Sequence, residues 1–324
     1  MSRIILSTIV LFAFVLMGQS QTPYTLTAND VTVENGVITS STLTNSDGDN
    51  FQPDIIISKK LKGQVITEIG EDAFKGKNLS SVVLPAALKS IGSSAFKNNR
   101  LTSIDFPDGL MVIGDSAFQN NRITSVTLPK GLTSLNKSVF ESNNIISVDL
   151  PKGLTSIGHG AFRDNSLINV DLPAGLTSLG SFSFQNNRLI SVDFPAGITT
   201  IEEMAFNVNF LTHMDFHEGI TTIEDSAFRD NRITSVNFPE SLTSIGDSAF
   251  LANRITQVDF PAGLTSVGEK AFSVNDDLSN FVLPKVSSTG NSLQWEASNG
   301  IALGTDYVVL PEDFGYSYKA IIQD

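Results

Sequence analysis

The chain has 324 residues, no cysteine, 34 acidic against 21 basic side chains and a net charge of −13. Its 41% apolar residues can bury a core, so the composition excludes a disordered chain. The lack of cysteine excludes disulfides, thiolate metal sites and a cysteine nucleophile, and the acidic charge argues against nucleic acid as a partner.

The first twenty residues predict a secretory signal peptide. Arg3 precedes an apolar run over residues 4–17, and residues 18–20 are the small and polar residues that signal peptidase reads before its cleavage point. The run is shorter than the roughly 20 apolar residues that span a bilayer, and no later segment is long and apolar enough for a span. We therefore predict cleavage near Ser20 and a protein that is secreted or held at the cell surface.

Residues 21–70 are expected to form an N-terminal β cap that includes a degenerate first repeat. The segment 24–54 is not periodic, but residues 30–34 alternate as a strand does, and residues 55–70 resemble one repeat with a short insertion. An open solenoid exposes a strand edge, which such a cap covers.

Residues 71–284 carry an internal repeat with a period of 22 residues. Proline and asparagine follow the same period as phenylalanine. The phenylalanines are Phe74, Phe96, Phe118, Phe140, Phe162, Phe184, Phe206, Phe228, Phe250 and Phe272, and the asparagines are Asn99, Asn121, Asn143, Asn165, Asn187, Asn209, Asn231, Asn253 and Asn275.

One repeat, residues 100–121, shows how each coil should fold. Leu101, Ile104 and Phe106 predict a strand with one buried face, and residues 107–109 predict a proline–glycine turn. We expect a β-rich, right-handed leucine-rich-repeat solenoid of about ten such repeats. It should have a parallel sheet on its concave face and short 3-10 or irregular segments on its convex face. The Phe column should pack as the core, and the Asn column should satisfy backbone groups of the turns.

The recurring Leu-Thr-Ser-Val-x-Phe-Pro-x-Gly-Leu-Thr-Ser-Ile-Gly-x-x-Ala-Phe-x-x-Asn resembles the BspA-like leucine-rich repeats, also called the Treponema pallidum type. The resemblance covers about residues 55–284. Family repeats often run 23 residues and often carry cysteine where Asn99 and its equivalents stand. Family members are surface or secreted proteins, many of them thought to act in adhesion, so the resemblance implies a role in protein binding.

A column of aspartates is the predicted ligand-binding site. Asp149, Asp171, Asp193 and Asp215 should point outward from successive strands about 4.8 Å apart, where two unit charges repel by about 1 kcal/mol in water. His213 stands in the neighbouring outward column. Most flanking coils carry an arginine ahead of the strand, and these middle coils largely lack it. We predict an acidic patch for cations or a basic partner; the alternative is that the aspartates keep the sheet soluble and unpaired at its surface.

Two further possibilities concern chemistry around residues 201–220. His213, Asp215 and His217 are spaced so that a regular strand would place them on one face, where they could bind a divalent ion, but His217 falls at the expected turn and repeat drift is the alternative. No serine stands in a Gly-x-Ser-x-Gly context and no phosphate-binding loop is present. We predict no enzymatic activity and no cofactor.

Residues 285–324 fall outside the period and are expected to form a C-terminal cap. They hold Trp295, Tyr307, Tyr316 and Tyr318. Such aromatics either fill the open end of the core or bind sugar. The sequence thus favours a binding protein for an extracellular, host or cell-surface protein, and its alternative is a glycan-binding or structural surface-layer protein that uses these aromatics.

Overall fold

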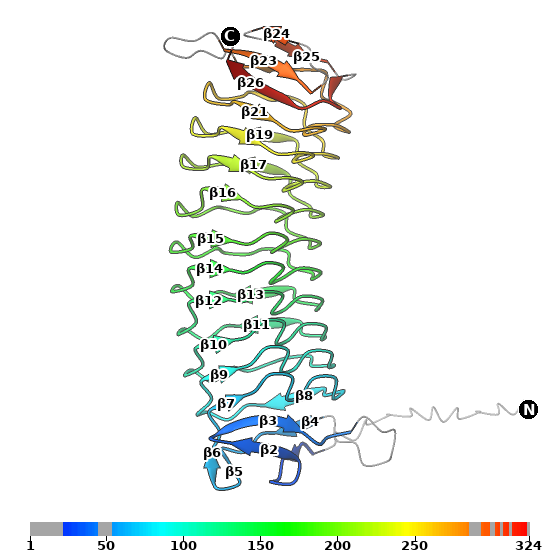
Figure 1. The fold of residues 1–324 in the computed structure, drawn as a ribbon. Helices are drawn as coiled ribbons and strands as arrows, with labels where there is room; N and C mark the ends of the chain where they lie inside the picture. The colour runs from blue at the N-terminus through cyan, green and yellow to red at the C-terminus, as the bar shows by residue number, and fades with distance from the viewer. Residues whose placement is uncertain are drawn as a thin grey trace, which may run out of the picture.

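The computed structural model describes residues 22–44, 54–284, 293–298, 302–304, 307–310 and 313–322. The predicted signal peptide lies outside these residues. The chain winds into a tall column of stacked coils, with the N-terminal strands at one end and the C-terminal strands at the other (Figure 1). Each 22-residue repeat is one coil of a parallel β-solenoid, which confirms the predicted fold class. The described residues contain no α-helix.

The predicted strands form the first face of the column. Parallel pairs are in register at an offset of one repeat, as Ser125 pairs with Ser147 and His213 with Ser235. Pairing is interrupted, so the face consists of several small sheets rather than one continuous sheet. Its strands are β1 (Tyr24–Thr25), β4 (Asp54–Ile56), β8 (Ser81–Val83), β11 (Ser125–Thr127), β13 (Ser147–Asp149), β17 (His213–Asp215), β19 (Ser235–Asn237), β22 (Phe281–Leu283) and β25 (Tyr307–Val309).

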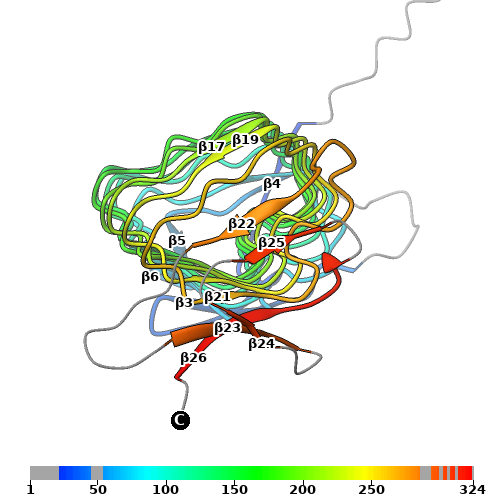
Figure 2. The ribbon, with the colours of Figure 1, turned by 90° about the horizontal axis from the view of Figure 1, so that it is seen from above.

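A second ladder of short strands, which the sequence analysis did not predict, forms the second face. The proline–glycine turn returns the chain so that the Thr-Ser-Ile segments of successive coils pair; the N–H of Gly92 donates to the carbonyl of Ile69 at 2.7 Å. Seen along the column axis, the coils superimpose (Figure 2). The strands are β7 (Glu68–Ile69), β9 (Ser90–Ile91), β10 (Val112–Ile113), β12 (Ser134–Leu135), β14 (Ser156–Ile157), β15 (Ser178–Leu179), β16 (Thr200–Ile201), β18 (Thr222–Ile223), β20 (Ser244–Ile245) and β21 (Ser266–Val267).

The third side of each coil is a turn with two residues in the left-handed conformation. Its N–H groups donate to the next coil, as Ser94 does to the carbonyl of Asp115 at 2.8 Å. Glycine and asparagine adopt this conformation most easily, yet Val208 and Val274 occupy it with φ of 55° and 57°. The first column is Asp72, Ser94, Ser116, Ser138, Gly160, Phe182, Met204, Ser226, Ser248 and Lys270, and the second is Gly76, Asn98, Asn120, Ser142, Asp164, Asn186, Val208, Asp230, Ala252 and Val274.

The Phe column is the spine of the core, as predicted. All ten rings are buried, and successive rings stack with centroids 5.3–5.7 Å apart and interplanar angles of 3–15°. A shorter ladder, Phe194, Phe216, Phe238 and Phe260, stacks beside it. Because a single coil cannot enclose these rings, burial is achieved only by stacking.

The Asn column joins neighbouring coils through buried hydrogen bonds, which confirms its structural role. In Asn187, Oδ1 accepts from the N–H of Leu167 at 3.0 Å, and Nδ2 donates to the carbonyls of Phe162 and Phe184 at 2.9 and 3.1 Å. The other asparagines of the column repeat this arrangement.

Strands at the two ends extend the second ladder. At the N-terminal end β3 (Val37–Ser41) pairs with β7, and at the C-terminal end β26 (Tyr318–Ile322) pairs antiparallel with β21. The remaining strands are β2 (Val31–Glu34), β5 (Lys60–Leu61), β6 (Gln64–Val65), β23 (Leu293–Ala297) and β24 (Ala302–Gly304).

Candidate functional site on the first face

The structure places the four predicted aspartates in one exposed column, here called the Asp ladder: Asp149, Asp171, Asp193 and Asp215. Asp149 ends β13 and Asp215 ends β17. The other two hold the equivalent positions of the coils between, where strand pairing lapses. Those coils remain stacked through backbone hydrogen bonds at residues 166–168 and 188–190.

The carboxylates of the Asp ladder are only partly engaged. Thr127 Oγ1 donates to Asp149 Oδ2 at 3.2 Å, and Asn237 Nδ2 donates to Asp215 Oδ1 at 2.9 Å. Asp171 and Asp193 have no hydrogen bond or ion pair with any other described residue. The centre of the ladder therefore presents two carboxylates whose hydrogen-bonding capacity remains for a partner.

The arginines that precede the strands do not neutralise the Asp ladder by direct contact. The ion pairs among the described residues lie elsewhere, for example between Arg229 and Asp230 at 3.2 Å. Arg232 instead stacks over the ring of Phe210, with its guanidinium carbon 4.0 Å from the centroid. The predicted neutralisation in the flanking coils therefore does not take the form of ion pairs between described residues.

The structure does not bring His213, Asp215 and His217 together as a metal-binding site. His213 is exposed on β17, but His217 lies in the following turn, where its Nδ1 is 2.9 Å from the carbonyl oxygen of Glu218. Within the described parts of the chain, no three histidine or acidic side chains come close enough to hold a metal ion. Of this trio, His213 and Asp215 share the exposed face and His217 does not.

Two features beside the Asp ladder were missed in the sequence. A pocket of about 550 Å³ lies at the end of β13 and is lined by Asp149, Lys130 and Lys152 among others. Three half-exposed isoleucines, Ile146, Ile168 and Ile190, also lie in the coils of the ladder. The 22-residue period assigns the three isoleucines to one position of the repeat, but the period alone does not distinguish an exposed isoleucine from a buried one.

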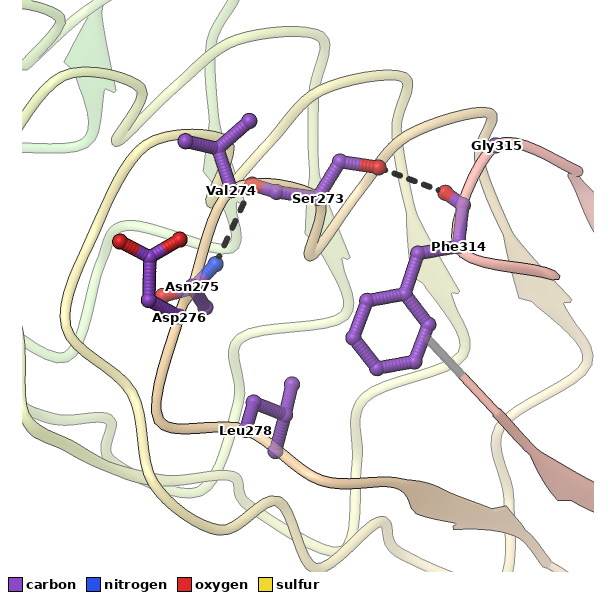
Figure 3. A pocket seen from close by; sticks show the side chains of 7 residues that line it. All are labelled: Ser273, Val274, Asn275, Asp276, Leu278, Phe314 and Gly315. Atoms are coloured by element: carbon purple, nitrogen blue, oxygen red, sulfur yellow. Dashed lines mark hydrogen bonds between the residues drawn. The ribbon is translucent and has the colours of Figure 1, made fainter. Parts of the chain in front are cut away.

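A second pocket, of about 310 Å³, lies where the C-terminal segment crosses the last coil (Figure 3). Ser273 Oγ donates to the carbonyl of Phe314 at 2.8 Å and joins its two walls. Asn275 is already engaged by the core, and Asp276 is the one ionisable residue in the lining.

The C-terminal aromatics are largely turned into the protein. Trp295 and Tyr318 are buried, and the Trp295 indole donates to the carbonyl of Pro284 at 2.8 Å. Burial raises the pKa of Tyr318 well above its usual value, and the nearby Asp313, Tyr307 and Tyr316 raise it further. A sugar needs an accessible aromatic face, which the buried Trp295 and Tyr318 do not offer; Tyr307 and Tyr316 are partly buried against the core.

Another acidic cluster lies on the third side of the coils. Burial raises the pKa of Glu224, and the neighbouring Asp225, Glu202 and Glu203 raise it further. Asp225 Oδ1 accepts from the N–H of Asp247 at 2.7 Å and so links adjacent coils. This cluster has a structural part in coil stacking.

The family model for the BspA type leucine rich repeat region matches residues 67–189, 134–256 and 177–298, with six copies. The chain belongs to this family. A leucine-rich repeat protein from Bacteroides ovatus ATCC 8483 is similar in structure, with a TM-score of 0.61, 22% identity and 81% of each chain covered. The pneumococcal vaccine antigen PcpA is similar with a TM-score of 0.58 and 21% identity, over 79% of this chain and 80% of that chain.

The similarity to these structures shows that the chain has the fold of a leucine-rich repeat protein. No curated protein matches the chain. Among the residues that the structure describes, no helix has the length and apolar character needed to cross a membrane.

Proposed function

We propose that this BspA type protein is exported, as a secreted or cell-surface protein, and binds an extracellular protein through its first face without catalysing a reaction. The Asp ladder carries the proposal. Four exposed carboxylates stand in adjacent coils, none of them forms an ion pair with a described residue, and the central two also lack a hydrogen-bond partner among those residues. A row of uncompensated like charges is unfavourable in the free protein, and a basic partner surface relieves it. His213 borders the ladder and belongs to the proposed contact surface.

The experiment is capture of extracellular and cell-surface proteins on the immobilised chain from residue 21 onward, at about 50 mM and about 500 mM NaCl. The test variant replaces all four ladder aspartates by asparagine, which keeps side-chain shape and removes charge. The control variant removes equal charge outside the face, by Glu→Gln at Glu34, Glu71, Glu240 and Glu269, all of which are exposed.

Each exposed ion pair contributes about 0.2–1 kcal/mol, so loss of four weakens binding by at least about fourfold. We expect a protein that salt releases, that the asparagine variant retains poorly and that the control retains fully. A partner retained equally by both variants would refute the assignment of the first face.

A further inference from the structure

Three consecutive coils expose an isoleucine where their neighbours carry a hydroxyl residue. Ile146, Ile168 and Ile190 are 50%, 41% and 47% exposed and are called here the Ile ladder. The N–H of Ile168 donates to the carbonyl of Ile146 at 3.4 Å, and that of Ile190 to Ile168 at 3.3 Å, so the three residues lie in one column. The equivalent residues in flanking coils are Ser80, Thr102, Thr124, Thr212, Thr234 and Thr256.

The Ile ladder runs beside the Asp ladder in three of its four coils, those of Asp149, Asp171 and Asp193. Each isoleucine precedes its aspartate by three residues, which is about 10 Å of extended chain. Small polar side chains, Ser147, Asn169 and Ser191, lie exposed between the two ladders. The first face thus joins an apolar row to a parallel acidic row, and exposed apolar side chains that adjoin in this way mark interaction sites.

Charge and spacing identify the occupant. A second copy of the chain is disfavoured, because its net charge of −13 and its own Asp ladder would be repelled. Coils lie about 4.8 Å apart, close to the 5.4 Å pitch of an α-helix, whereas same-side residues of a strand are about 6.7 Å apart. Over the three steps of the Asp ladder, the mismatch is about 2 Å for a helix and about 6 Å for a strand.

We propose that the Ile and Asp ladders form a docking site for a basic amphipathic α-helix of a partner protein, laid along the column axis. Its apolar side chains cover the Ile ladder, and its lysine or arginine side chains face the Asp ladder. A helix about 10–12 Å wide contacts both rows at once. This inference rests on the proposed function, because it specifies the partner surface for the same face.

The test uses a labelled synthetic peptide of about four helical turns, with leucine along one stripe and lysine along the adjacent stripe, in fluorescence anisotropy. A peptide of the same composition in scrambled order is the charge-matched control probe. The protein variant is Ile146→Thr, Ile168→Thr and Ile190→Thr together, which installs the residue of the flanking coils. The matched control, Met111→Thr with Val112→Thr, removes residues that are 60% and 50% exposed on the second face.

We expect the striped peptide to bind the wild-type chain and to bind the Ile-ladder variant at least about tenfold more weakly, with the control variant unchanged. The scrambled peptide should bind weakly to all three proteins. Equal affinity of the striped and scrambled peptides, or of the wild-type and Ile-ladder proteins, would overturn the proposal.

Two further measurements separate this proposal from the function on which it rests. If the wild-type and Ile-ladder proteins capture the same extracellular protein equally well, the proposed function stands and the helix site is wrong. If the wild type captures none while striped-peptide binding requires the Ile ladder, the proposed function is wrong and the docking chemistry stands. Self-association of the wild type that the Ile-ladder substitutions abolish, measured by sedimentation velocity, would assign the face to a second copy and overturn the proposal.

Discussion

Replacing one asparagine of the buried column tests how the coils are joined. In Asn187→Ala, the buried N–H of Leu167 loses its acceptor, Asn187 Oδ1. The carbonyls of Phe162 and Phe184 each lose one of two amide donors but keep the other, from Asn165 and Asn209 respectively. The substitution therefore leaves one buried donor unpaired and weakens two acceptors, without removing apolar volume from the Phe column.

An unpaired buried donor costs about 1–3 kcal/mol, and the two weakened acceptors add less than one ordinary hydrogen bond each. We expect Asn187→Ala to lower the free energy of unfolding by about 2–4 kcal/mol. The assay is urea unfolding followed by circular dichroism, compared with Asn186→Gly. Asn186 is the exposed neighbour with φ of 53°, and glycine retains that conformation. A loss for Asn187→Ala within about 0.5 kcal/mol of the control would refute the reasoning.

Three other predictions concern strain and charge. Val208→Asn should raise the free energy of unfolding by about 1 kcal/mol in the same urea assay, because valine is strained at φ of 55°; no gain would contradict this strain. Burial acts to raise the pKa of Asp30, but hydrogen bonds from the Thr27 N–H, the Thr27 hydroxyl and the Tyr24 hydroxyl outweigh it and lower the pKa. The stabilisation by the Asp30 carboxylate should therefore be lost as pH falls below the usual aspartate range. Protection of the β2 amides against hydrogen exchange should then decrease at acid pH, and Asp30→Asn should abolish this pH dependence. The pKa of Glu224 is raised because burial and the neighbouring carboxylates disfavour its charged form, so Glu224→Gln should increase the melting temperature at neutral pH. The increase should be larger at low salt and absent at pH values where Glu224 is protonated. A lower melting temperature at neutral pH would contradict the repulsion between these carboxylates.

The repeat period made most of the fold predictable. Phe, Pro and Asn recur at one interval, which indicates a coil, its core and its turn without reference to any structure. The second strand ladder was missed because its segments, such as Ser90–Ile91, are too short to show alternation. The left-handed columns were missed because residues such as Phe182 and Met204 carry no turn signal there, and only the stacking of coils imposes the conformation.

The site was predictable in position but not in environment. Asp149 and its equivalents share a column because they share a repeat position, and the structure bears out their exposure. Whether an arginine contacts them depends on side-chain conformation, and Arg232 proved to stack on Phe210. The exposed Ile168 was missed because an isoleucine beside a strand is ordinarily assigned to the core, and only the coil geometry shows it facing solvent.

Hydroxyl-radical footprinting of the chain with its captured partner tests the central claim most directly, because it reports which side chains the partner covers. Binding through the first face predicts protection of Ile146, Ile168 and Ile190, with Met111 and Val112 on the second face oxidised as in the free protein. Protection of the second-face pair with the isoleucines still oxidised would contradict the account.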